Sequence, residues 1–144
     1  MSTVITRYAL LFVLGAIVLL AATRNLFSSS AIVIAAQILA VGIMVRARRL
    51  FPTQTFRVDA TPSAETFIRG GPYQLIRHPM YSAALLFIWA AVLSHLSLLT
   101  MSIGAFVTII AALRIVFEDD SLRSRYPEYA AYARVTKAVV PYVI

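Results

Sequence analysis

The sequence predicts an all-α integral membrane bundle of about four transmembrane helices, with a polar cytoplasmic loop and a C-terminal helical segment. Of its 144 residues, 60% are hydrophobic and only 13% are charged, which leaves too little polar surface for a soluble domain of this size. The charged side chains also gather outside three long uncharged blocks, as membrane-crossing segments require. A chain of this length is expected to form one domain, residues 1–144.

The three uncharged blocks cover residues 8–23, 25–45 and 80–113. A crossing helix needs about 20 mostly apolar residues, so each of the first two blocks fits one helix. The third is too long for one helix, and Ser-His-Leu-Ser at residues 94–97 is its only polar break. We therefore expect helices at residues 6–23, 29–46, 79–94 and 97–118, because only helices pair all backbone polar groups inside a bilayer at this spacing.

Basic residues predict the orientation of these helices. Residues 46–77 carry six arginines and the segment after residue 118 carries four basic residues, whereas the turn at residues 94–97 carries none. The positive-inside rule then places both termini and the middle loop in the cytoplasm, in a multi-pass arrangement. In so apolar a chain, the net charge of +7 favours an anionic membrane face over a nucleic-acid partner.

Four further features of the sequence bear on the fold and on the possible sites. The first 23 residues also fit a signal peptide, with Arg7 before a short apolar core and small residues at its end. Residues 51–68 hold two prolines without clean periodicity and predict an irregular cytoplasmic loop. The chain has no cysteine, which excludes disulfides, thiolate metal sites and a cysteine nucleophile. Its two histidines fall at opposite membrane faces, so no shared metal is expected.

A first cluster of special residues, RGGPYQLIRHPMYSAAL at residues 69–85, leads into the third apolar block. Its Gly-Gly-Pro at residues 70–72 predicts a tight turn that permits close backbone approach to a ligand. His78 and Pro79 predict a helix start, whose free N–H groups favour an anion. Arg77 adds a positive charge, and His78 and Tyr81 are spaced to face one pocket. The alternative is an interfacial anchor of arginine and tyrosine.

Two more constellations follow in the chain. Arg114 and Glu118 are four residues apart near the membrane end of the fourth helix and share one helix face. Ionisable residues there predict a functional site, in which the arginine grips a carboxylate. The alternative is a snorkelling arginine paired with its neighbour. Tyr126, Tyr129 and Tyr132 have helical spacing and form either a stripe that packs on the bundle or a lid over a pocket.

Together these segments resemble the isoprenylcysteine carboxyl methyltransferase family and the related phospholipid methyltransferases. The resemblance covers residues 65–141 and rests on the order and spacing of several motifs. The matching residues are Gly71, Pro72, Tyr73, Arg77, His78, Pro79, Met80, Tyr81, Arg114, Glu118, Asp119, Leu122, Tyr126, Pro127, Tyr129, Tyr132 and Pro141. The chain departs from the family pattern at Ala83 and Pro127, where glycine is common, and at Asp119, which replaces a glutamate.

The resemblance implies that S-adenosylmethionine binds from the cytoplasmic side, which makes the middle segment a cytoplasmic cofactor-binding loop. The cofactor contacts that it implies are Glu65, Thr66, Phe67, Ile68, Tyr73, His78, Pro79, Met80 and Tyr81. It also implies a catalytic pair, Arg114 and Glu118, on the substrate side. The glycine departures bear on the identity of the substrate more than on the cofactor.

The implied activity is S-adenosylmethionine-dependent methyl transfer to a membrane-partitioned acceptor, most simply the carboxylate of an isoprenylcysteine. Lipophilic small molecules, lipids and prenylated molecules are the expected partners, together with membrane lipids. For a carboxylate acceptor Arg114 would position the substrate, whereas for an amine Glu118 would become the candidate base. Two other functions remain open: a nicotinamide-dependent reductase with the layout of sterol reductases, and a non-catalytic membrane scaffold. The oligomeric state stays open.

Overall fold

A computed structural model describes residues 2–50 and 67–140 of the chain. Within these residues the structure is all-helical, with an isolated parallel bridge between Ile76 and Lys137 in place of any strand. The helices of the described part are α1 (Ser2–Ala22), α2 (Ala31–Arg49), the 3-10 helix η1 (Gly71–Gln74), α3 (Pro79–Ser94), α4 (Leu98–Arg125) and α5 (Tyr129–Val135).

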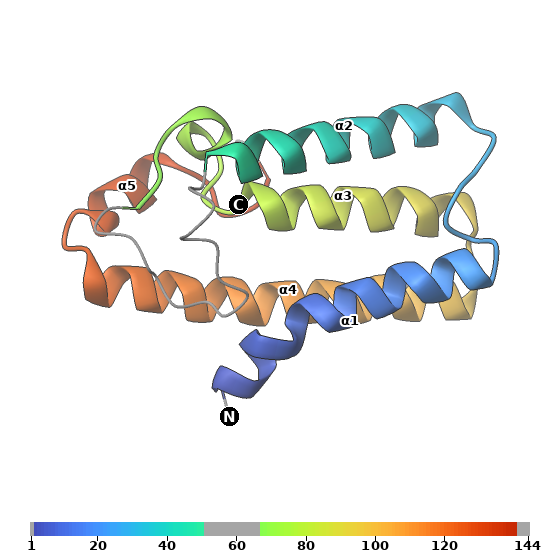
Figure 1. Ribbon diagram of the computed structural model, residues 1–144, viewed down its shortest axis with the longest axis horizontal. Helices are drawn as coiled ribbons and strands as arrows, with labels where there is room; N and C mark the ends of the chain where they lie inside the picture. The colour runs from blue at the N-terminus through green and yellow to red at the C-terminus, as the bar shows by residue number, and fades with distance from the viewer. Residues whose placement is uncertain (1, 51–66, 141–144) are drawn as a thin grey trace.

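The four long helices run side by side along the longest axis of the molecule (Figure 1). The α1–α2 connection and the α3–α4 turn lie at one end, and η1, α5 and the last turns of α4 gather at the other. All four predicted helices are confirmed, and the boundaries of α3 agree with the prediction. The expected loop at residues 51–68 falls mostly on residues 51–66, outside the described part of the chain.

Two of these helices, α2 and α4, are long and apolar enough to cross a membrane by length and composition. The apolar part of α1, Tyr8–Ala22, and the whole of α3 are shorter. The described residues therefore contain two candidate membrane-spanning helices, and the bundle of four crossings stays a prediction. Large apolar side chains such as Ile32, Leu98 and Ile109 are exposed on the outer faces, as a lipid environment allows.

The turn between α3 and α4 lies where the polar break predicted it. Ser97 is the N-cap of α4 and forms a capping box with Thr100, which satisfies two N–H groups of the helix start. His95 follows the last residue of α3. Next to this turn, a buried apolar cluster of Leu20, Ile88, Val92 and Val107, among others, holds α1, α3 and α4 together.

Candidate functional site

The 3-10 helix η1 brings the chain to the start of α3. Gly71 has φ +56, a left-handed conformation that glycine adopts without steric cost. A Cβ at this position would lie 2.9 Å from Cδ1 of Leu50, just after α2. The predicted tight turn is therefore confirmed. Among the described residues, the group that the Gly71 backbone approaches closely is the Leu50 side chain.

His78 and Pro79 begin α3 as predicted, His78 as N-cap and Pro79 as the first helical residue. The imidazole is buried and lies between two neighbouring carboxylates of α4. Its Nε2 is 2.7 Å from Oδ1 of Asp119, and its Nδ1 is 4.0 Å from Oε2 of Glu118. Tyr81 lies beside it, with ring centroids 5.7 Å apart. The side chains of His78 and Tyr81 therefore face the same way, as expected from their spacing.

Tyr81 also connects the two residues of the predicted catalytic pair. Its hydroxyl donates a hydrogen bond of 2.8 Å to Oε2 of Glu118, while the guanidinium carbon of Arg114 lies 5.8 Å from the centre of its ring. Arg114 is only 9% exposed, so its guanidinium is inside the protein rather than extended into lipid. Arg114, Tyr81 and Glu118 therefore lie together, on the facing sides of α3 and α4.

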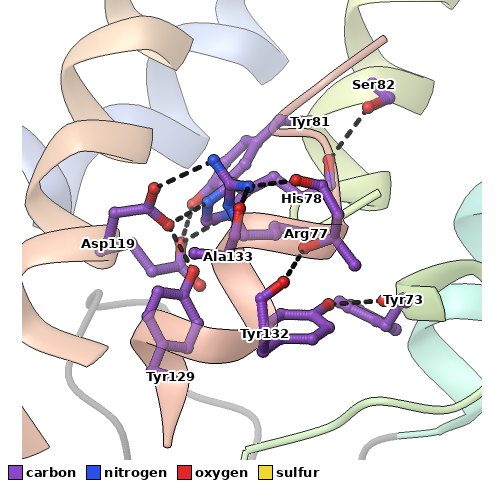
Figure 2. A network of polar contacts seen from close by, with 11 residues as sticks. Tyr73, Arg77, His78, Tyr81, Ser82, Asp119, Tyr129, Tyr132 and Ala133 are labelled. Atoms are coloured by element: carbon purple, nitrogen blue, oxygen red, sulfur yellow. Dashed lines mark hydrogen bonds and ion pairs between the residues drawn. The ribbon is translucent and has the colours of Figure 1, made fainter. Parts of the chain in front are cut away.

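Asp119 is the centre of a second set of contacts, and the sequence had not placed it in the site. Its Oδ1 accepts hydrogen bonds from the Tyr129 hydroxyl and from the His78 ring, and its Oδ2 lies 3.6 Å from Nη2 of Arg77 (Figure 2). Tyr129 belongs to α5, His78 is the N-cap of α3, and Arg77 lies one residue before His78. The sequence feature that could have identified Asp119 as a site residue is its position directly after Glu118.

The tyrosines near the C-terminus form an aromatic cluster around Phe67, whose ring centroid is 5.5 Å from that of Tyr126 and 5.1 Å from those of Tyr129 and Tyr132. The Tyr132 hydroxyl donates a 2.5 Å hydrogen bond to the Tyr73 carbonyl. Burial raises the pKa of Tyr132 to about 12. Burial and the Asp119 carboxylate also raise the pKa of Tyr129. Both hydroxyls therefore remain protonated donors at neutral pH.

Of the two roles that the spacing of these tyrosines suggested, the structure supports the packed stripe, and the lid over a pocket stays a prediction. Their rings pack together as a stripe, while the hydroxyls of Tyr129 and Tyr132 reach the polar cluster. The helical spacing itself is only partly realised, because Tyr126 caps α4 and α5 begins at Tyr129.

The structure brings most of the predicted cofactor-binding residues to this end of the bundle. Phe67 and Ile68 lead into η1, Tyr73 is buried within it, and the remaining four form the start of α3: His78, Pro79, Met80 and Tyr81. Glu65 and Thr66, together with the motif residue Pro141, lie outside the described residues. The geometry shows that the described residues lie close together; their contact with a cofactor stays a prediction.

Comparison with known proteins adds independent information. A family model described as "Phospholipid methyltransferase" matches residues 25–129, which include η1, α2, α3 and all of α4. The cobalt-zinc-cadmium resistance protein CzcN of Cupriavidus metallidurans is 40% identical over 82 residues, which cover 53% of this chain. The chain covers only 36% of the length of that relative. No solved structure matches the chain.

Proposed function

The chain belongs to the phospholipid methyltransferase family, and on this premise we propose that it transfers a methyl group from S-adenosylmethionine to a membrane-partitioned acceptor. Family membership supports membrane methyltransferase activity; the donor and the acceptor are our proposal. The observation that supports it best is the convergence of four side chains, where the start of α3 faces the second half of α4: His78, Tyr81, Arg114 and Glu118.

The residues at this end fit S-adenosylmethionine chemically. The Glu118 side chain is 30% exposed, and its carboxylate can accept more hydrogen bonds than the one from Tyr81. A partly exposed carboxylate that can accept further hydrogen bonds is suited to bind a positively charged sulfonium or α-amino group. Phe67 is only half-buried, unlike the buried tyrosines next to it, so its ring keeps aromatic surface of the kind on which a nucleobase stacks. The donor would reach these residues from the cytosol.

When bound, the donor supplies a methyl group on a positively charged sulfur, which is already activated for in-line displacement. The main task of the protein is then alignment, which can lower the barrier by about 7–11 kcal/mol. Arg114 is suited to position an acceptor carboxylate through two parallel hydrogen bonds. Tyr81 would hold the Glu118 carboxylate in place through its 2.8 Å hydrogen bond.

The charges of the cluster favour a carboxylate acceptor, such as that of an isoprenylcysteine. Arg77 lies beside Asp119, and Arg114 and Glu118 both contact Tyr81. With histidine counted as neutral, the formal charges of these two arginines and two carboxylates cancel. A donor with one net positive charge and a carboxylate with one negative charge keep that balance. Unbalanced charge is costly in a largely buried site. A carboxylate is also ionised at neutral pH and needs no base.

An amine acceptor, such as a lipid headgroup, is the second candidate. The reacting amine would have to lose a proton, and the partly exposed Glu118 is the candidate base. In either case the apolar part of the acceptor would enter from the bilayer between the helices. We also propose four crossings within a single domain, residues 1–144, with both termini and the site on the cytoplasmic side.

A thermal unfolding experiment on purified protein in detergent tests the choice of donor. A ligand present at 100 times its Kd stabilises the folded state by about 2.7 kcal/mol, so S-adenosylmethionine is expected to raise Tm. A rise with reduced nicotinamide dinucleotides alone would instead support a reductase of the sterol-reductase layout. No rise with either class would favour a non-catalytic scaffold and contradict the proposal.

A further inference from the structure

Arg77 binds the C-terminal segment of the chain to the site. Its Nη1 donates hydrogen bonds to the carbonyl oxygens of Ala133, at 2.9 Å, and Thr136, at 2.5 Å. Its Nη2 lies 3.6 Å from Oδ2 of Asp119 (Figure 2). One largely buried guanidinium therefore joins three parts of the structure: the residue before His78, the end of α5 and the carboxylate that contacts His78.

The main chain repeats the same connection. The amide of Arg77 donates to the Lys137 carbonyl at 2.7 Å, and the amide of His78 donates to the Ala138 carbonyl at 3.1 Å. In return, the amide of Lys137 donates to the Leu75 carbonyl at 3.1 Å. The Ser82 hydroxyl donates to the Val139 carbonyl at 2.6 Å. We call residues 136–139, which follow α5, the C-terminal strap.

The strap depends on these contacts for its position. It follows α5, which has only seven residues, and so short a helix is not stable by its own hydrogen bonds. Arg77 is suited to hold it because the planar guanidinium donates in several fixed directions at once. A lysine ammonium is a single point on a flexible stem, so it cannot make the same three contacts with the same geometry.

We propose that Arg77 is a positioning residue that clamps the C-terminal strap against the start of α3 and thereby fixes His78 and Asp119 for donor binding. This inference rests on the proposed function, and it adds the strap as one wall of the donor site. When the clamp is lost, the pairing of residues 75–78 with residues 137–138 weakens. His78 then loses both its main-chain partner and the fixed orientation of Asp119.

Hydrogen exchange on the full chain in detergent tests the clamp without any donor or acceptor. In Arg77→Gln and in Arg77→Lys, the amides of residues 77, 78 and 137 are expected to exchange at least ~10-fold faster than in the wild type. Arg134→Gln is the matched control, since it removes a positive charge from an exposed position on the neighbouring helix. Its exchange should equal that of the wild type. Unchanged exchange in both Arg77 variants would overturn the proposal.

Donor binding then separates a positioning role from local stability. For Arg77→Lys, KM for S-adenosylmethionine is expected to rise at least ~10-fold, while kcat at saturating donor changes by less than ~3-fold. Faster exchange with an unchanged donor KM would show that the strap is not part of the site and would overturn the proposal. A wild-type protein that does not bind the donor would contradict the proposed function, and the exchange comparison alone would then decide whether Arg77 holds the strap.

Discussion

Glu118 and Asp119 are neighbours in the chain, but their surroundings give them different tasks. Asp119 is 16% exposed and contacts His78, Tyr129 and Arg77. Glu118 is 30% exposed and accepts a hydrogen bond from Tyr81. A carboxylate surrounded by donors is suited to hold its neighbours in place, whereas one with spare lone pairs is suited to bind a ligand.

The first prediction concerns the proposed catalytic pair. Arg114→Ala and Glu118→Ala are each expected to lower kcat/KM for methyl transfer at least ~10-fold, because each removes a group proposed to align the reactants. Insertion and expression should stay normal. Asp120→Ala and Arg123→Ala are matched controls, since both side chains are exposed on the same helix. Equal rates in all four variants would remove the pair from the site.

The second prediction uses the two histidines at opposite ends of α3. His78→Ala removes the imidazole between Glu118 and Asp119 and is expected to weaken S-adenosylmethionine binding at least ~10-fold. His95→Ala changes a residue at the far turn and should leave the affinity unchanged. Calorimetry on both proteins measures the difference. Equal affinities would exclude His78 from the donor site.

At the scale of elements, local signals account for most helix boundaries. Pro79 begins α3, and the serines at 94 and 97 flank its turn. The end of α4 was predicted too early, at residue 118, five residues after the apolar block ends at residue 113. The helix continues to Arg125, and its 28 residues extend about 42 Å, longer than the hydrocarbon core. It ends where Pro127 disfavours helical geometry at Tyr126.

The third prediction concerns the turn that begins η1. Gly71→Ala places a side chain at φ +56, which costs about 1–2 kcal/mol of folding free energy. Gly70→Ala is the matched control, because its φ is −87 and a Cβ there meets nothing within 4 Å among the described residues. Thermal unfolding in detergent should therefore show a lower Tm for Gly71→Ala only. Equal Tm values for the two variants would contradict the described turn.

At the scale of the whole molecule, the sequence predicted the helices, the pairing of His78 with Tyr81 and the pairing of Arg114 with Glu118. That the two pairs belong to one site was implied by the family resemblance. The sequence did not predict the bridge between Ile76 and Lys137 or the Arg77 contacts with Ala133 and Thr136. Those contacts use backbone carbonyls of residues more than 50 positions away, and carbonyls are the same in every residue. A periodic pattern of side chains therefore cannot predict these contacts with the backbone.

The fourth prediction concerns the arrangement in the membrane. The chain has no cysteine, so single cysteines can be placed without background. Phe27 lies in the α1–α2 connection and Leu96 in the α3–α4 turn, and both are exposed. These two segments lie at the same end of the bundle (Figure 1), so Phe27→Cys and Leu96→Cys are expected to react with an impermeant maleimide in intact cells. Ser124→Cys, near the other end, should react only after permeabilisation, because the positive-inside rule places that end in the cytoplasm. The reverse pattern would contradict the proposed orientation.

Transfer of a labelled methyl group to a membrane component tests the central claim most directly. Membranes containing the wild type or Glu118→Ala are incubated with S-adenosylmethionine that carries a tritiated methyl group, and the apolar extract is counted and examined by mass spectrometry. We expect label in the wild-type extract on a species heavier by one CH₂ group, and at least ~10-fold less label with Glu118→Ala. Equal label in the two extracts, or none in either, would contradict the account.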